Sequence, residues 1–132
     1  GSGRNRLCLS YYRDTAAGIL LAHQKGKSGD DYILGNENLT FVQIWAAIAQ
    51  VLGKQPPRVR IPLAVLKFIA TASRTVTGKS AFPPDFFDML GSDWCFSNAK
   101  ARTQLGWQPH TFADGIRETW ADYQKQGWGK TS

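Results

Sequence analysis

The sequence contains the same four-residue helix-start pattern twice, and this pattern constrains the fold more than any other feature. Thr40 is followed three residues later by Gln43, and Thr111 by Asp114. In each pair the threonine hydroxyl can accept a hydrogen bond from the backbone amide three residues on, while the second side chain reaches back to the amide of the threonine. We therefore expect one helix to begin at Thr40 and run towards Gly53, and another to begin at Thr111.

Between these two helices, the segment from Ser97 to Pro109 has clear signals for the start and the end of a helix. Ser97 or Asn98 can cap a short basic helix, and Gly106 can end it by adopting a left-handed conformation. Leu105 and Trp107 on either side of this glycine are expected to fix the helix end to the core. The segment contains no obvious nucleophile, metal ligand or phosphate-binding loop, so we interpret it as a packing element.

In the rest of the chain, apolar runs are separated by glycine and proline, and we predict a helix or a strand for each run. Asp14 fits the N-cap of a helix that stops in the glycines and lysines after residue 25. The remaining expected elements are strands within 4–12, 31–35 and 58–61, and helices over 14–25, 63–76 and 83–90. The predicted fold class is α/β (α+β), a helix-rich small lobe with about three short strands and five or six helices.

A length of 132 residues predicts one domain. The opening Gly-Ser-Gly, residues 1–3, resembles a cloning scar, and the tail over 127–132 is expected to be flexible. The domain itself is expected to cover residues 4–126.

The net charge of +6 raises the question of nucleic-acid binding. The sixteen lysines and arginines are spread along the chain, and no stretch of five to eight residues is mostly basic. A dedicated nucleic-acid surface is therefore not expected, although a small basic nucleic-acid binder stays an alternative. The sequence has no apolar run long enough to span a membrane, and no membrane partner is expected.

Searches for catalytic and metal-binding patterns give no candidate. Cys8 and Cys95 lack the spacing of a zinc site or a disulfide framework, and we interpret them as reduced thiols of a cytoplasmic protein. The two Gly-Lys-Ser triplets lack the earlier glycine of a phosphate loop. His23 and His110 stand without a neighbouring acidic residue or second histidine. No catalytic residue and no metal ligand is predicted.

The stretch from Ser97 to Trp120 resembles the C-terminal part of the extended short-chain dehydrogenase/reductases, the NAD-dependent epimerase/dehydratase family. Two further stretches, residues 11–22 and 32–44, resemble earlier elements of that family, and the three occur in the family's order and cover nearly the whole chain. The residues that carry the resemblance are Asp14, Ala16, Ser97, Lys100, Ala101, Leu105, Gly106, Trp107, Pro109, Asp114 and Gly115.

This resemblance implies the substrate-binding lobe of an NAD(P)-dependent sugar epimerase, dehydratase or reductase. In the family, a separate Rossmann lobe carries a glycine-rich cofactor loop and a Tyr-x3-Lys catalytic pair. This chain contains neither motif, so it holds no complete Rossmann domain. We expect no cofactor-binding residue here, and we expect the isolated chain to be catalytically silent. NAD or NADP is implied only for a full-length parent.

The resemblance implies the missing Rossmann lobe and a small-molecule substrate as partners, and assembly with further copies of the chain is a further alternative. An alternative interpretation is a standalone binding or oligomerisation module descended from such a lobe. Family members that bind nucleotide-diphosphate sugars carry two arginines that this chain lacks, since Leu7 occupies the first position and residues 86–96 contain no arginine. The resemblance therefore favours the dihydroflavonol-reductase-like and hopanoid-associated epimerase-like branches.

Five residues are candidates for contact with substrate or with the missing lobe. Tyr11, Tyr12 and Arg13 end the first expected strand, and Arg58 and Arg60 share one face of a later one. The two later arginines could bind an anion or simply face solvent. Four aromatic residues could line an apolar pocket or pack in the core under the last two helices: Phe86, Phe87, Trp94 and Phe96.

Overall fold

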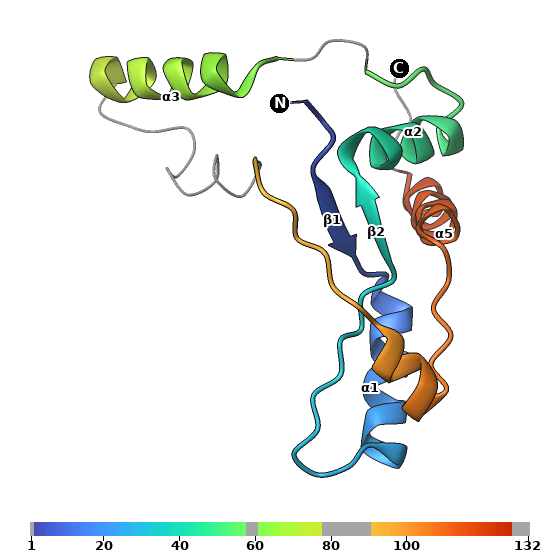
Figure 1. Ribbon diagram of the computed structural model, residues 1–132. Helices are drawn as coiled ribbons and strands as arrows, with labels where there is room; N and C mark the ends of the chain where they lie inside the picture. The colour runs from blue at the N-terminus through green and yellow to red at the C-terminus, as the bar shows by residue number, and fades with distance from the viewer. Residues whose placement is uncertain (1, 58–60, 78–90, 128–132) are drawn as a thin grey trace.

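Two antiparallel strands and five helices make up the part of the chain described by the computed structural model, which covers residues 2–57, 61–77 and 91–127. The elements in chain order are β1 (Arg6–Leu9), α1 (Tyr12–Lys25), β2 (Glu37–Thr40), α2 (Phe41–Val51), α3 (Leu63–Thr77), the π-helix η1 (Ala101–Leu105) and α5 (Phe112–Lys125). Figure 1 shows their arrangement. The helix-rich mixed α/β class predicted from the sequence is confirmed.

The sheet is small and consists of β1 paired antiparallel with β2. Leu7 lies opposite Leu39, and Cys8 lies opposite Asn38. On its other edge β1 meets Trp94 in a single parallel bridge, in which the amide of Cys8 donates to the carbonyl of Trp94 over 2.7 Å. This bridge brings the segment before η1 alongside β1 (Figure 1).

Both predicted capping boxes are present. The hydroxyl of Thr40 accepts from the amide of Gln43 at the start of α2, and the hydroxyl of Thr111 accepts from the amide of Asp114 at the start of α5. In each case the second side chain also accepts from the threonine amide. The helix predicted over 63–76 is confirmed as α3.

The most deeply buried cluster lies between α1 and η1. Leu105 and Ala101 are fully buried and Trp107 is 2% exposed, with Leu34 packed against them. Gly106 between the two large side chains has a φ of 70°, the left-handed conformation expected of it. The Leu-Gly-Trp segment therefore anchors a helix end in the core, as predicted.

Two local predictions were wrong. Residues 31–35 form no strand, because their side chains are used for packing: Tyr32 and Leu34 lie against the buried cluster, and the second strand forms later, at Glu37. Asp14 is not the N-cap of α1, because the helix begins at Tyr12 and the carboxylate of Asp14 is drawn into a buried network instead. The expected strand at 58–61 falls mostly, and the expected helix at 83–90 wholly, outside the described residues.

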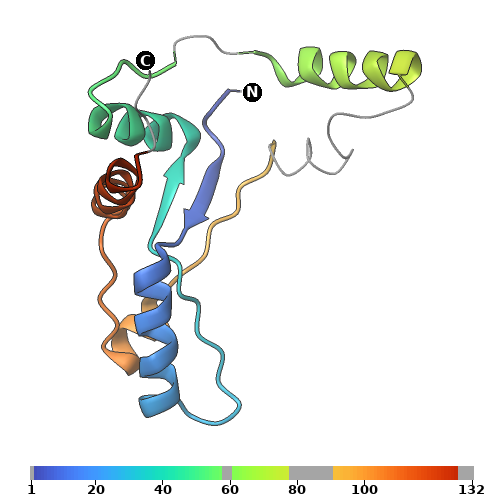
Figure 2. The same ribbon diagram turned by 180° about the vertical axis from the view of Figure 1, so that it is seen from behind.

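The molecule is elongated, and α3 lies at one end of it. Seen from behind, the sheet, α2 and α5 form the middle, α1 and η1 form the opposite end, and α3 stands apart from all of them (Figure 2). None of the described helices is long and apolar enough to cross a membrane.

Candidate functional site

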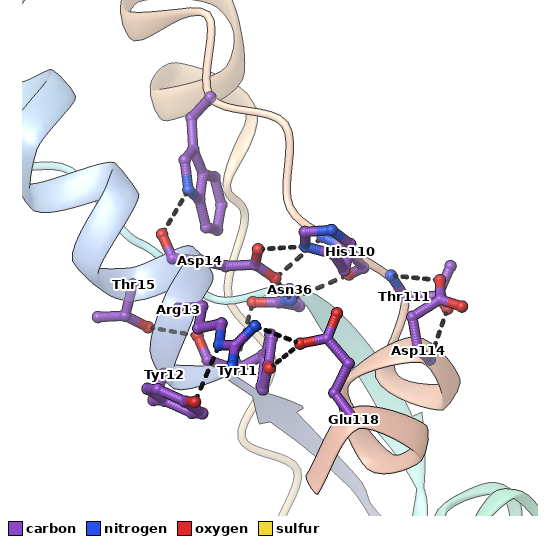
Figure 3. A network of polar contacts seen from close by, with 11 residues as sticks. Tyr11, Tyr12, Arg13, Asp14, Thr15, Asn36, His110, Thr111, Asp114 and Glu118 are labelled. Carbon is purple, nitrogen blue, oxygen red and sulfur yellow. Dashed lines mark hydrogen bonds and ion pairs between the residues drawn. The ribbon is translucent and has the colours of Figure 1, made fainter. Parts of the chain in front are cut away.

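The three adjacent candidates Tyr11, Tyr12 and Arg13 lie at the junction between β1 and α1, where the chain also meets α5 (Figure 3). Tyr11 is the N-cap of α1 and is buried, at 8% exposed. Its hydroxyl donates to Oε2 of Glu118 on α5 over 2.5 Å. Burial, followed by this hydrogen bond to a carboxylate, raises the pKa of Tyr11 above its ordinary value of 10.0. The phenol is therefore held protonated.

The approach of the Tyr11 ring to α5 depends on Gly115. A Cβ at this position would lie 3.1 Å from the ring of Tyr11, which is closer than carbon atoms normally pack. Gly115 is one of the positions that carry the family resemblance, and this contact gives it a structural reason.

Tyr12 and Arg13 take different orientations from Tyr11. Tyr12 is 61% exposed, and its hydroxyl accepts from Nε of Arg13 over 2.9 Å. The guanidinium of Arg13 lies 3.0 Å from Glu118 and 3.9 Å from Asp122, both on α5. Arg13 is thus already paired with two carboxylates, which makes it a poor anchor for an anionic ligand and a good link between α1 and α5.

Arg58 and Arg60, the second pair of candidates, lie outside the described residues. The structure therefore brings together the first three candidates and does not place the other two. Trp94 and Phe96 are 47% and 48% exposed, so neither of them is a core residue of the described chain. Phe86 and Phe87 lie outside the described residues.

A second group of polar residues, which sequence reasoning did not connect, lies beside Tyr11. Asp14 is 4% exposed, and its carboxylate accepts from the side-chain amide of Asn36 over 2.5 Å and from the backbone amide of His110 over 2.9 Å. The ring Nδ1 of His110 lies 2.6 Å from the other carboxylate oxygen. Figure 3 shows the three side chains pointing at one another. The buried charge is thus compensated from three directions.

The hydrogen bond to Asp14 also acts on the histidine. Together with the negative charge of Asp14, it raises the pKa of His110 above its ordinary value of 6.5. The sequence signal for this pair is weak, because Asp14 and His110 lie 96 residues apart. The sequence singled out Asp14 as a helix N-cap and as a position of family resemblance, but not as a partner of His110. The expectation that His110 lacks an acidic partner was wrong.

Two hollows adjoin this region. The first, of about 100 Å³, lies between the end of β1 and α5, and its lining includes Leu9, Ser10, Tyr11, Phe112, Ile116 and Thr119. The second, of about 430 Å³, is open and polar, and it is lined by Asn36, Asn38, Cys95, Phe96, Ser97 and Asn98. The first is large enough for a few water molecules or a small apolar group, but not for a dinucleotide.

The side-chain amides of Asn38 and Asn98, which line the open hollow, form hydrogen bonds with backbone groups of the chain. Asn38 donates to the carbonyl of Phe96 over 2.9 Å and accepts from its amide over 3.1 Å, so its side chain acts like one more backbone link between β2 and the segment before η1. The side-chain amide of Asn98 donates to the carbonyls of Gly35 and Asn36. Among the residues that the structure describes, no three histidine, cysteine or acidic side chains form a cluster that could hold a metal ion.

Comparison with known proteins finds similarity both to a curated protein and to solved structures. The chain is 32% identical, over 127 residues, to a protein of Synechocystis sp. that bears the name "Putative dihydroflavonol 4-reductase". The match covers 90% of this chain and 37% of that relative. The chain also superimposes on the crystal structure of gox2253 with a TM-score of 0.75 and 27% sequence identity. This match covers 94% of this chain and 39% of the gox2253 chain. No family model matches the chain.

These matches bear on the family resemblance seen in the sequence. The matches support the resemblance of this chain to a C-terminal portion of a short-chain dehydrogenase/reductase-like protein. The family resemblance predicted from the motifs is confirmed, and the chain spans little more than a third of the proteins it matches. Within this portion, the motif residues Asp14, Gly106, Trp107 and Gly115 all make structural contacts in and around the core.

Proposed function

We propose that this chain is the substrate-binding portion of an NAD(P)-dependent reductase or epimerase, with the cofactor held by another part of the parent protein. The observation that carries the proposal is the pattern of coverage: the match extends over 90% of this chain but only 37% of the relative. The name of that relative refers to a reductase, and reductases of this family take their hydride from a nicotinamide cofactor.

The residues present do not fit a nicotinamide dinucleotide. A dinucleotide needs a glycine-rich turn that leads from a strand into a helix N-terminus, so that backbone amides can hold the pyrophosphate. β1 leads into α1 through Ser10 and Tyr11, and a buried tyrosine side chain stands where such a turn would need glycine. β2 leads directly into α2 through Thr40. We therefore assign no step of hydride transfer to this chain.

The role proposed for this chain is to position substrate and contact the rest of the parent at the start of α1. Tyr12 presents an exposed phenol there, and Arg13 holds the phenol in place through the bond from Nε. The ion pairs from Arg13 to Glu118 and Asp122 link this corner to α5.

A titration tests whether the cofactor binds outside this chain, in another part of the parent protein. Tryptophan fluorescence of the isolated chain is followed on addition of NADH and NADPH, and we expect no saturable binding of either. In the longer parent protein we expect saturable binding and cofactor-dependent reduction of a dihydroflavonol or a related ketone. Saturable cofactor binding by the isolated chain would refute the proposal.

A substitution tests the role of Tyr12. In the parent, Tyr12→Ala is expected to raise KM for the ketone about tenfold with little change in kcat, because it removes binding contact rather than chemistry. Tyr123→Ala on α5, which removes a similarly exposed phenol at 48%, serves as the matched control and should change neither constant. Equal effects of the two variants would contradict the assignment of Tyr12.

A second candidate function, a standalone binding or oligomerisation module, is favoured by the exposed side chains Ile19 and Leu20 on α1, which are 58% and 62% exposed. Sedimentation of the isolated chain over a hundredfold concentration range distinguishes the two. A concentration-dependent dimer that Leu20→Ser disrupts would support the module, whereas a monomer throughout would exclude it.

A further inference from the structure

The two cysteines are far apart in the sequence but lie on neighbouring segments of the fold. Cys8 belongs to β1, and Cys95 belongs to the segment before η1 that runs alongside β1 (Figure 1). A parallel bridge joins Leu7 to Trp94, and the two cysteines are the residues that directly follow this pair. Residues one position beyond a bridged pair share a face of the two strands. Neighbouring strands lie about 4.8 Å apart, which falls within the range of about 4.4–6.8 Å between Cα atoms that a disulfide spans.

Hydrogen bonds hold the residues on both sides of Cys95 in place. Before it, the carbonyl of Trp94 accepts from the amide of Cys8 over 2.7 Å. After it, the carbonyl of Phe96 accepts from the side-chain amide of Asn38 over 2.9 Å, and the amide of Phe96 donates back to the same side chain over 3.1 Å. Asn38 is the residue that lies opposite Cys8 in the sheet. Cys95 is therefore held beside Cys8 through both of its chain neighbours.

The thiol of Cys8 lies against this same segment. Burial raises the pKa of the Cys8 thiol, a hydrogen bond from the backbone of Phe96 lowers it, and the negative charge of Cys95 raises it further. The last two effects act at short range, so both residues lie close to the sulfur atom. On another side the sulfur touches Gly35, where an added Cβ would overlap it. The sulfur of Cys8 therefore lies against Gly35 and against the segment that contains Cys95.

The two thiols differ in their access to solvent. Both are free, but Cys95 is exposed whereas Cys8 is half-buried. Cys95 also lines the open hollow of about 430 Å³, which has room for a small oxidant. Because exposure favours the oxidation of a cysteine, an oxidant in solution reaches Cys95 first. Cys8 is placed to react with the oxidised sulfur of Cys95 rather than with the oxidant itself.

From this arrangement we propose that Cys8 and Cys95 form a redox-active pair, which a hydroperoxide oxidises to a disulfide within the chain. The thiolate of Cys95 attacks one oxygen of hydrogen peroxide, the O–O bond breaks, and a sulfenic acid and one water form. The thiolate of Cys8 then attacks the sulfenic sulfur, the S–S bond forms, and the hydroxyl leaves as a second water. The two thiols lose two electrons and two protons in total, and the peroxide gains them.

The disulfide would fasten the segment before η1 to the edge of the sheet, where the bonds from Cys8 and Asn38 already hold it. In a reducing compartment such a bond is typical of a redox-sensing site rather than of a permanent crosslink. The site is separate from Tyr12 and Arg13, and the proposal does not depend on the function proposed above.

Peroxide treatment of the chain as it stands tests the proposal. The reduced chain is treated with a small molar excess of hydrogen peroxide, the remaining thiols are blocked with iodoacetamide, and the intact chain and its tryptic peptides are analysed by mass spectrometry. We expect a monomeric product that has lost two hydrogen atoms, takes up no iodoacetamide and yields one crosslinked peptide containing Cys8 and Cys95. Dithiothreitol should restore both thiols. In Cys8→Ser the reaction should stop at the sulfenic acid of Cys95, which dimedone traps.

The matched control moves one thiol by two residues and keeps the number of thiols. In the double variant Cys95→Ser with Ser97→Cys, the second thiol lies beyond Phe96, the residue that Asn38 holds. We expect its disulfide to form about tenfold more slowly than in the unchanged chain, because the sulfur atoms are no longer held together. A similar decrease in rate is expected when the unchanged chain is oxidised in concentrated urea, since the fold supplies the proximity.

Three results would overturn the proposal. Peroxide could convert Cys95 to sulfenic or sulfinic acid without joining it to Cys8, or the disulfide could join two chains. The moved thiol or the unfolded chain could also react as fast as the folded, unchanged one. The experiments on the unchanged chain need no substitution, so they decide the question even if the double variant does not fold.

Discussion

The ion pair between His110 and Asp14 makes stability depend on pH. The pKa of His110 is raised in the folded protein by its bond to Asp14, from an ordinary value of 6.5. A group whose pKa is higher when folded contributes stability that is fully present below the unfolded pKa and is lost as pH rises through the folded pKa. Stability should therefore decrease as pH rises from about 6.5 through the folded pKa of His110.

Urea unfolding between pH 5 and 9 measures this loss. His110→Asn keeps a side-chain N–H that can donate to Asp14 but does not titrate, so its stability should lack this component of the pH dependence. The pair would be irrelevant to stability if the two proteins showed parallel curves over the whole range.

Asp14 should contribute more to the free energy of unfolding than any exposed carboxylate does. Replacing it with Asn leaves buried donors from Asn36 and His110 facing an amide, which can accept at only one of its two ends. We expect Asp14→Asn to reduce the free energy of unfolding by about 2 kcal/mol. The control Asp122→Asn, at a carboxylate on the surface of α5, should change it by less than about 0.5 kcal/mol. Equal effects would show that the buried network adds nothing.

At the scale of the elements, the helix stop at Gly106 depends on its left-handed backbone. With φ at 70°, any other residue is strained there, and Gly106→Ala should destabilise the protein by about 1–2 kcal/mol. Gly91→Ala is the matched control, since an added Cβ at this position would lie 3.6 Å from Leu63, an ordinary contact. Thermal unfolding of both variants checks the difference, which should vanish if residue 106 can relax.

The buried cluster between α1 and η1 should account for much of the cohesion of that end of the molecule. Leu105 is fully buried, so Leu105→Ala should cost about 3 kcal/mol through lost burial and the cavity it leaves. Leu20→Ala removes the same atoms from an exposed site and should be nearly neutral. Urea midpoints compare the two, and a small effect at Leu105 would mean that the cluster collapses to fill the space.

The elements that the sequence predicts correctly are those whose determinants are local. Thr40 with Gln43, Thr111 with Asp114, and Gly106 act within a few residues of themselves, and all three predictions are confirmed. The network of Asp14, Asn36 and His110 joins residues 22 to 96 positions apart, and no local pattern could reveal it. The strand expected at 31–35 was wrong for the same reason, because distant packing partners determine how its side chains are used.

At the scale of the whole molecule, the chain contributes a corner in which the start of α1 is linked to α5, and its sequence contains no glycine-rich cofactor loop. Tyr11 and Arg13 tie the start of α1 to α5, and Tyr12 stays exposed beside them. The motif residues that carry the family resemblance serve this packing, and under the proposed function the chemistry would depend on residues outside this chain. The sequence could therefore place Tyr11, Tyr12 and Arg13 next to the end of β1, but it could not predict the direction of each side chain.

We propose above that this chain is part of a longer cofactor-dependent protein, and the sequence of its gene tests this most directly. The measurement is the DNA sequence upstream of the codon for Arg4. Since the matched region is 37% of the relative, we predict a continuous reading frame of about two hundred codons that encodes a glycine-rich loop and a Tyr-x3-Lys pair. A stop codon in frame directly upstream of Arg4 would contradict the account, and would show that the lobe exists without the cofactor-binding part.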